Sequence, residues 1–119
     1  MNRLYGLIGF PLGHSFSARY FTEKFQRENL SGYEYRNFPL ESIRELPAML
    51  ENHPGLLGFN VTIPYKQEVI PSLTALSTEA REIGAVNCVK ITPQGLYGHN
   101  TDAYGFRKSL LGLIGPMRP

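Results

Sequence analysis

The chain has 119 residues, which is the length of one domain and is enough to enclose a hydrophobic core. Hydrophobic residues make up 42% and charged residues 18%, a composition typical of an ordered globular protein rather than a disordered one. The net charge is only +2 and no run of Lys or Arg occurs, so we do not expect nucleic acid as a partner. No apolar stretch is long enough to cross a bilayer.

The cysteine content and the N-terminal residues indicate the cellular compartment and whether a metal site is expected. The single cysteine, Cys88, cannot form an internal disulfide, and a metal site would need several ligands. The first residues lack the succession of basic, apolar and small residues that marks a signal peptide. We therefore expect a cytoplasmic protein that binds neither a metal, a nucleic acid nor a membrane, and these features leave open whether it is a monomer or homodimer.

In chain order, the first half alternates between strand and helix patterns. Residues 4–10 form an apolar run that predicts a strand buried on both faces. Residues 33–38 show the aromatic alternation of a second strand. Between them, four aromatic residues at helical spacing predict a helix that ends before Gly32: Phe16, Tyr20, Phe21 and Phe25. Residues 40–50 predict a further helix, in which Pro47 marks a break or a fresh start.

The second half begins with residues 56–63, an apolar run that predicts a third strand. Pro64 suits the first position of a helix, so we expect a short helix that contains Lys66 in its first turn. The remaining expected elements are a helix at 74–83 with Leu76, Ala80 and Ile83 facing inward and Gly84 ending it, a hairpin of strands 87–91 and 96–98, and a last helix opened by residues 100–102.

Strands that alternate with helices predict the fold class. We expect one α/β domain over residues 1–119, a three-layer sandwich with a mostly parallel sheet of about six strands, one of them antiparallel, flanked by helices. In such sheets the ligand crevice lies beyond the carboxyl ends of the strands. Three polar clusters fall at such positions: Ser15 with Ser17, then Asn60 with Thr62 and Lys66, and then Asn87 with residues 100–102.

Each cluster has a structural and a functional interpretation. Ser15 and Ser17 at a helix start could hold a carboxylate or a phosphate, or Ser15 could only cap the helix. Lys66 could lean into water; alternatively, the positive end of a helix dipole disfavours its ammonium form and would make it a useful general base. Asp102 could cap the last helix or lie beside Lys66 and share the proton of one substrate hydroxyl. Together these groups would suit a small polyhydroxylated acid.

Four motifs in order resemble those of shikimate dehydrogenase, and the resemblance covers nearly the whole chain. They are IGFPLGHSFS at 8–17, NVTIPYK at 60–66, GAVN at 84–87 and NTD at 100–102. The resemblance implies a reversible, NADP-dependent reduction of 3-dehydroshikimate to shikimate, on the pathway to chorismate and the aromatic amino acids. It also implies residue roles: Ser15 and Ser17 would bind the substrate carboxylate, Thr62, Asn87 and Asp102 its hydroxyls, and Lys66 would be the acid/base coupled to Asp102.

The sequence departs from the family pattern in two ways. Ala18, Tyr20, Phe21 and Cys88 replace the usual residues, which affects helix packing and the shape of the pocket. The chain also has no G-x-G-x-x-G turn between a strand and a helix, so we expect NADP to be bound by a Rossmann domain that is absent from this chain, and the isolated fragment to be inactive. Two alternatives remain: half of a quinate/shikimate dehydrogenase, or a stand-alone binding module for a cyclic polyol acid.

Overall fold

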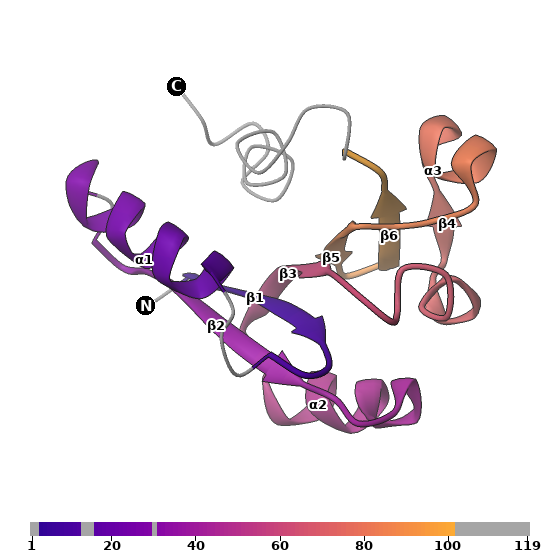
Figure 1. The fold of residues 1–119 in the computed structure, drawn as a ribbon, viewed down its shortest axis with the longest axis horizontal. Coiled ribbons are helices and arrows are strands. Elements are labelled where there is room, and N and C mark those ends of the chain that lie inside the picture. The colour runs from indigo at the N-terminus through magenta and orange to yellow at the C-terminus, as the bar shows by residue number, and fades with distance from the viewer. Residues whose placement is uncertain (1–2, 13–15, 30, 102–119) are drawn as a thin grey trace.

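The computed structural model describes residues 3–12, 16–29 and 31–101, with the backbone alone for residues 16–18, and the statements below concern these residues (Figure 1). The main elements alternate between strand and helix. They are β1 (Arg3–Gly9), α1 (Phe16–Arg27), β2 (Tyr33–Pro39), η1 (Ile43–Glu45), α2 (Leu46–Asn52), β3 (Leu56–Val61), η2 (Ile70–Ser72), β4 (Ala75–Leu76), α3 (Thr78–Ile83), β5 (Cys88–Thr92) and β6 (Gly95–His99).

The six described strands form one mixed sheet in the order β2-β1-β3-β5-β6-β4. Strand β1 pairs in parallel with both β2 and β3, and β4 pairs in parallel with β6. The two antiparallel pairings, β3 with β5 and β5 with β6, share β5, so β5 is the strand that runs against the others. The expected α/β fold is thus confirmed as a six-stranded mixed sheet with helices.

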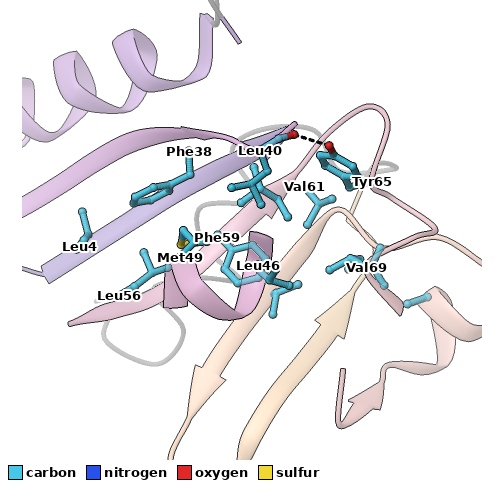
Figure 2. Packing of buried hydrophobic residues seen from close by; sticks show 14 residues of the cluster. Leu4, Phe38, Leu40, Leu46, Met49, Leu56, Phe59, Val61, Tyr65 and Val69 are labelled. Atoms are coloured by element: carbon cyan, nitrogen blue, oxygen red, sulfur yellow. Dashed lines mark hydrogen bonds between the residues drawn. The ribbon is translucent and has the colours of Figure 1, made fainter. Parts of the chain in front are cut away.

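Alternating side chains of the strands divide the interior into two cores. On one face of the sheet, α2 packs against β1, β2 and β3 (Figure 2). The residues of this α2-side core include Leu4, Ile8, Phe38, Leu46, Met49, Phe59, Val61, Tyr65, Val69, Ala80 and Val89. Because Phe59 and Ile8 are 0% exposed, this layer excludes water from the middle of the sheet.

The opposite face of β1 and β2 is covered by α1 (Figure 1). This α1-side core consists of Tyr5, Leu7, Leu12, Phe21, Phe25, Tyr35 and Cys88. The aromatic spacing that predicts the helix is confirmed, since Phe21 and Phe25 are buried and Tyr20 is half-buried. The ring centroids of Phe21 and Tyr35 are 4.7 Å apart, so the helix is fixed to the strand beneath it by aromatic packing.

Pro47 marks a fresh helix start, one of the two outcomes expected for it. The 3₁₀ helix η1 begins with a capping box in which the Ser42 side chain accepts from the N–H of Arg44 and the Glu45 carboxylate accepts from the N–H of Ser42. Helix α2 then begins at Leu46, with Pro47 in its first turn, where a missing N–H removes no helical hydrogen bond.

The expected helix that begins at Pro64 is wrong. The chain after β3 forms consecutive turns and reaches only a 3₁₀ helix at Ile70–Ser72. In an α-helix the carbonyl of Lys66 would accept from the N–H of Ile70, but here it accepts from Val86 at 2.7 Å. Ile70 donates instead to Gln67 at 3.1 Å. A long-range hydrogen bond therefore takes the place of the local one, and Lys66 lies in a turn.

The expected helix at 74–83 is correct only in its second half. Thr74 donates its N–H to Leu96 at 2.7 Å, and the following residues form β4 beside β6. Helix α3 starts only after Ser77, whose side chain accepts from the N–H of Ala80. The predicted stop is confirmed, since Gly84 ends the helix with φ +78°, a left-handed conformation that glycine adopts readily. Leu76 is half-buried and Ala80 fully buried as expected, but Ile83 is 61% exposed, so its predicted inward orientation is wrong.

The predicted hairpin is confirmed as β5 and β6, which are joined by a turn at Pro93 and Gln94. The helix expected from residue 102 onward lies outside the described residues. Among the helices that the structure does describe, none is both long and apolar enough to pass through a membrane.

Candidate functional site

Four strands begin or end on one side of the sheet, which we call the edge: β1, β3 and β6 end there, and β5 begins there. The register pairs Ile8 with Val61 near the carboxyl ends of β1 and β3. It then pairs Asn60 with Cys88, the first residue of β5, and Cys88 with His99, the last residue of β6. Polar residues just beyond these positions therefore lie at the same edge, which is where parallel α/β sheets bind ligands.

Thr62 follows β3 directly and packs against the end of β1. Its N–H donates to the carbonyl of Ile8 at 2.9 Å, and its side chain is half-buried. The close approach depends on Gly9, because a Cβ at that position would lie 2.5 Å from Cγ2 of Thr62 and 3.0 Å from the carbonyl oxygen of Ile63. Gly9 thus permits the position of Thr62 at the edge.

Asn87 joins three strands at this edge. Its N–H donates to His99 at 3.0 Å, and its carbonyl accepts from Val61 at 2.9 Å. Its side-chain oxygen accepts from the N–H of Thr101 at 2.9 Å and from the Thr101 hydroxyl at 3.3 Å. Asn87 is 8% exposed and Thr101 is half-buried, so these bonds are partly shielded from water. Asn87 consequently fixes the chain at Thr101, the residue immediately before Asp102.

The turn that carries Lys66 is anchored on both sides. The carbonyl of Lys66 accepts from Val86, the neighbour of Asn87, at 2.7 Å. The adjacent Tyr65 is 3% exposed and its hydroxyl donates to the carbonyl of Leu40, as Figure 2 shows. Lys66 itself is half-buried. The backbone of Lys66 is therefore held next to the start of β5, at the edge that also holds Asn87.

The structure brings three of the six predicted site residues to one edge: Thr62, Lys66 and Asn87. Ser15 and Asp102 lie outside the described residues, and only the backbone of Ser17 is described, in the first turn of α1. The meeting of Lys66 and Asp102 in one hollow therefore stays a prediction. The helix dipole that the sequence analysis places beneath Lys66 is absent, because that segment is not helical.

Two buried polar residues near this edge, Asn60 and Asn100, belong to the predicted polar clusters but were not among the predicted site residues. Asn100 donates its side-chain N–H to the carbonyl of Ala85 at 3.0 Å. Asn60, which the sequence placed only in a cluster, donates from Nδ2 to the hydroxyl of Tyr35 at 2.8 Å. The partner of Asn60 lies 25 residues earlier in the chain, so no local pattern could have indicated this pair.

The pKa of His99, the last residue of β6, is shifted at this edge. Its burial lowers the pKa below the usual value, the charge of Lys90 lowers it further, and Glu79 opposes both. His99 is therefore held in its neutral form and adds little positive charge to the edge. Within the described residues, no group of three or more His, Cys, Asp or Glu side chains is arranged to hold a metal ion.

Comparison with protein-family models matches residues 7–89 to the shikimate dehydrogenase substrate binding domain. Among curated relatives, shikimate dehydrogenase (NADP(+)) from Clostridium perfringens is 40% identical over 116 residues, covering 91% of this chain and 40% of the relative. The chain thus spans about two fifths of the length of the curated relatives that it matches.

Solved structures show the same fold. Shikimate 5-dehydrogenase from Listeria monocytogenes, in complex with shikimate and NAD, matches with a TM-score of 0.77 and 34% identity over 93% of this chain and 38% of that one. The ligand-free 5-ketofructose reductase of Gluconobacter sp. strain CHM43 matches with a TM-score of 0.79 and 30% identity over 94% of this chain and 40% of that one. The fold is therefore shared by a shikimate 5-dehydrogenase and a 5-ketofructose reductase.

Proposed function

Because the chain belongs to the shikimate dehydrogenase substrate-binding domain family, we propose that it binds shikimate and 3-dehydroshikimate and supplies the acid/base for their interconversion. The observation that carries this proposal is the edge at which Thr62, Lys66 and Asn87 are held together by main-chain hydrogen bonds. A rigid array of hydroxyl, amine and amide groups suits a ring with several hydroxyls.

In the proposed complex, the substrate carboxylate lies against Ser15 and Ser17 at the start of α1. Thr62, Asn87 and Asp102 hold the ring hydroxyls. The amine of Lys66, coupled to the carboxylate of Asp102, takes the proton from the hydroxyl oxygen on the carbon that is oxidised and returns it in the reverse direction. Asn87 supports this arrangement, since its hydrogen bonds to Thr101 hold the backbone immediately before Asp102 at the edge that carries Lys66.

The relatives' names include NADP(+), which would accept the hydride when the substrate is oxidised, and its reduced form NADPH would donate it in the reverse direction. Dinucleotide phosphates are bound by a glycine-rich turn that leads from a strand into a helix. Within residues 3–12, 16–29 and 31–101 no strand leads into a helix through such a turn, so these residues do not fit the cofactor. We propose that this chain handles the substrate and the proton, and that NADP is held by a separate Rossmann domain.

The proposal is tested by titrating the chain with shikimate and following amide and side-chain NMR signals. We expect saturable shifts at Thr62, Lys66 and Asn87, and much weaker binding of cyclohexanecarboxylate, which lacks the hydroxyls. Thr62→Val keeps the shape and removes one hydroxyl, so it should weaken binding about tenfold. Thr22→Val on the exposed surface of α1 is the matched control and should bind as the unaltered chain does. Shifts that avoid this edge would contradict the proposal.

A second candidate differs only in substrate. The Gluconobacter reductase of similar fold acts, by its name, on 5-ketofructose, and a quinate-tolerant dehydrogenase would also use this edge. Quinate and 5-ketofructose are therefore included as separate arms of the titration. Tighter binding of either than of shikimate would replace the proposed substrate.

A further inference from the structure

A buried tyrosine connects two elements of the proposed pocket. Tyr35 on β2 is 5% exposed, and its hydroxyl accepts from Nδ2 of Asn60 on β3 at 2.8 Å. Strand β1 lies between β2 and β3, so the side chain of Tyr35 extends over that strand to reach Asn60. Asn60 is also 5% exposed and lies two residues before Thr62.

The ring of Tyr35 packs against an aromatic residue of α1. Its centroid lies 4.7 Å from that of Phe21 in α1, and Phe21 is 0% exposed. Ser17 lies in the first turn of α1, one helical turn before Phe21. One side chain therefore contacts the helix that carries Ser17 and the strand that Thr62 follows.

The hydrogen bond matters because neither partner can turn to water. Burial raises the pKa of Tyr35 well above its usual value, more than the hydrogen bond from Asn60 lowers it, so the phenol is neutral at physiological pH. Its oxygen is then a neutral acceptor for the Asn60 amide. Removing a buried partner leaves the remaining polar group unsatisfied, at a cost of about 1–3 kcal/mol. The Tyr35 hydroxyl thus contributes to the orientation of the Asn60 amide.

We propose that Tyr35 is a positioning residue of the substrate pocket, which holds Asn60 and the adjacent end of β3 at a set distance from α1. The inference rests on the proposed function, because it assigns the serines and Thr62 to opposite ends of one bound shikimate. Tyr35 touches no substrate in this arrangement and acts through Asn60.

The test compares shikimate affinity in two matched variants. Tyr35→Phe keeps the ring and removes the hydroxyl, and should weaken shikimate binding by this chain about tenfold. Tyr33→Phe is the control, since Tyr33 is on the same strand and its hydroxyl accepts from Arg3 at 3.3 Å, at the end of β2 away from the edge. Its affinity should equal that of the unaltered chain. Both are measured well below the midpoint of thermal unfolding of each variant.

A double-mutant cycle separates positioning from a general loss of stability. Asn60→Ala should reproduce the loss of affinity, and Tyr35→Phe should add nothing in the Asn60→Ala background. Unchanged affinity in Tyr35→Phe, or additive losses in the double variant, would overturn the inference. If Tyr35→Phe fails to fold, unchanged affinity in Asn60→Ala overturns it equally. Absence of shikimate binding by the unaltered chain would instead overturn the proposed function.

Discussion

At the scale of single residues, the site is held by main-chain hydrogen bonds between segments that are distant in sequence. Asn87 makes hydrogen bonds to Val61, His99 and Thr101. Replacing it would therefore disturb the local structure of the edge as well as any binding. Lys66 is a cleaner probe, because its anchoring bond to Val86 comes from the backbone carbonyl and survives a change of side chain.

Lys66→Ala should therefore lower turnover far more than substrate affinity. We expect kcat for shikimate oxidation to fall about 10²–10⁴-fold, as is typical when a general acid/base is lost, with a much smaller change in KM. The measurement uses a protein in which this chain is joined to an NADP-binding domain. Lys24→Ala is the control, because Lys24 lies on α1 in a surface ion pair with Glu28. A kcat within threefold of the unaltered protein would remove Lys66 from the mechanism.

At this scale the sequence could predict that Lys66 and Asn87 lie at one edge better than it could predict which groups surround them. Lys66 and Asn87 do lie at one edge, as the crevice rule for α/β sheets predicts. The local sequence could not show that the helix expected at Lys66 does not form. The carbonyl of Lys66 bonds to Val86, which lies twenty residues further along the chain. Likewise, only the folded chain shows that Asn60 meets Tyr35.

At the scale of elements, the approach of β1 to the turn after β3 depends on a missing side chain. Gly9→Ala places a Cβ 2.5 Å from Thr62 Cγ2 and 3.0 Å from a backbone oxygen of Ile63. We expect a loss of about 1–3 kcal/mol in the free energy of unfolding, as for other overpacked sites. Gly55→Ala is the control, since nothing lies within 4 Å of its added Cβ. Urea denaturation followed by circular dichroism measures both. Equal free energies of unfolding in the Gly9→Ala and Gly55→Ala variants would contradict this prediction.

Elements with strong local signals were predicted well, and those that depend on partners were not. The aromatic helix α1 and the hairpin of β5 and β6 have periodic patterns and clear turn residues, and both are confirmed. Strand β4 has only two residues and exists because β6 pairs with it. A helical pattern at 74–83 cannot reveal that Thr74 bonds to Leu96 across the hairpin.

At the scale of the whole molecule, stability should depend on the buried centre of the sheet rather than on the apolar residues near the site. Phe59 is 0% exposed, whereas Ile63, four residues later, is 73% exposed. Phe59→Ala should lower the free energy of unfolding by about 3–5 kcal/mol. Ile63→Ala should change it by less than about 0.5 kcal/mol. Denaturant titration of the pair checks the contrast, and similar losses would mean that Ile63 is buried in solution.

The overall architecture followed from the alternation of strand and helix patterns, because each buried face needs a covering layer. The hairpin predicted one antiparallel strand, which is β5, but the positions of the strands in the sheet did not follow. They depend on pairings such as Asn60 with Cys88, which join segments whose local patterns are equally compatible with several neighbours.

The reversal of β5 places the two ends of the hairpin at opposite edges of the sheet. The start of β5 and the end of β6 lie at the edge with Asn87, while the connecting turn at Pro93 and Gln94 lies at the opposite edge and is exposed. That turn is therefore the part of the hairpin that lies away from Asn87. We expect that a dye attached at the exposed Gln94 would leave the proposed binding of shikimate at the other end of the hairpin unchanged.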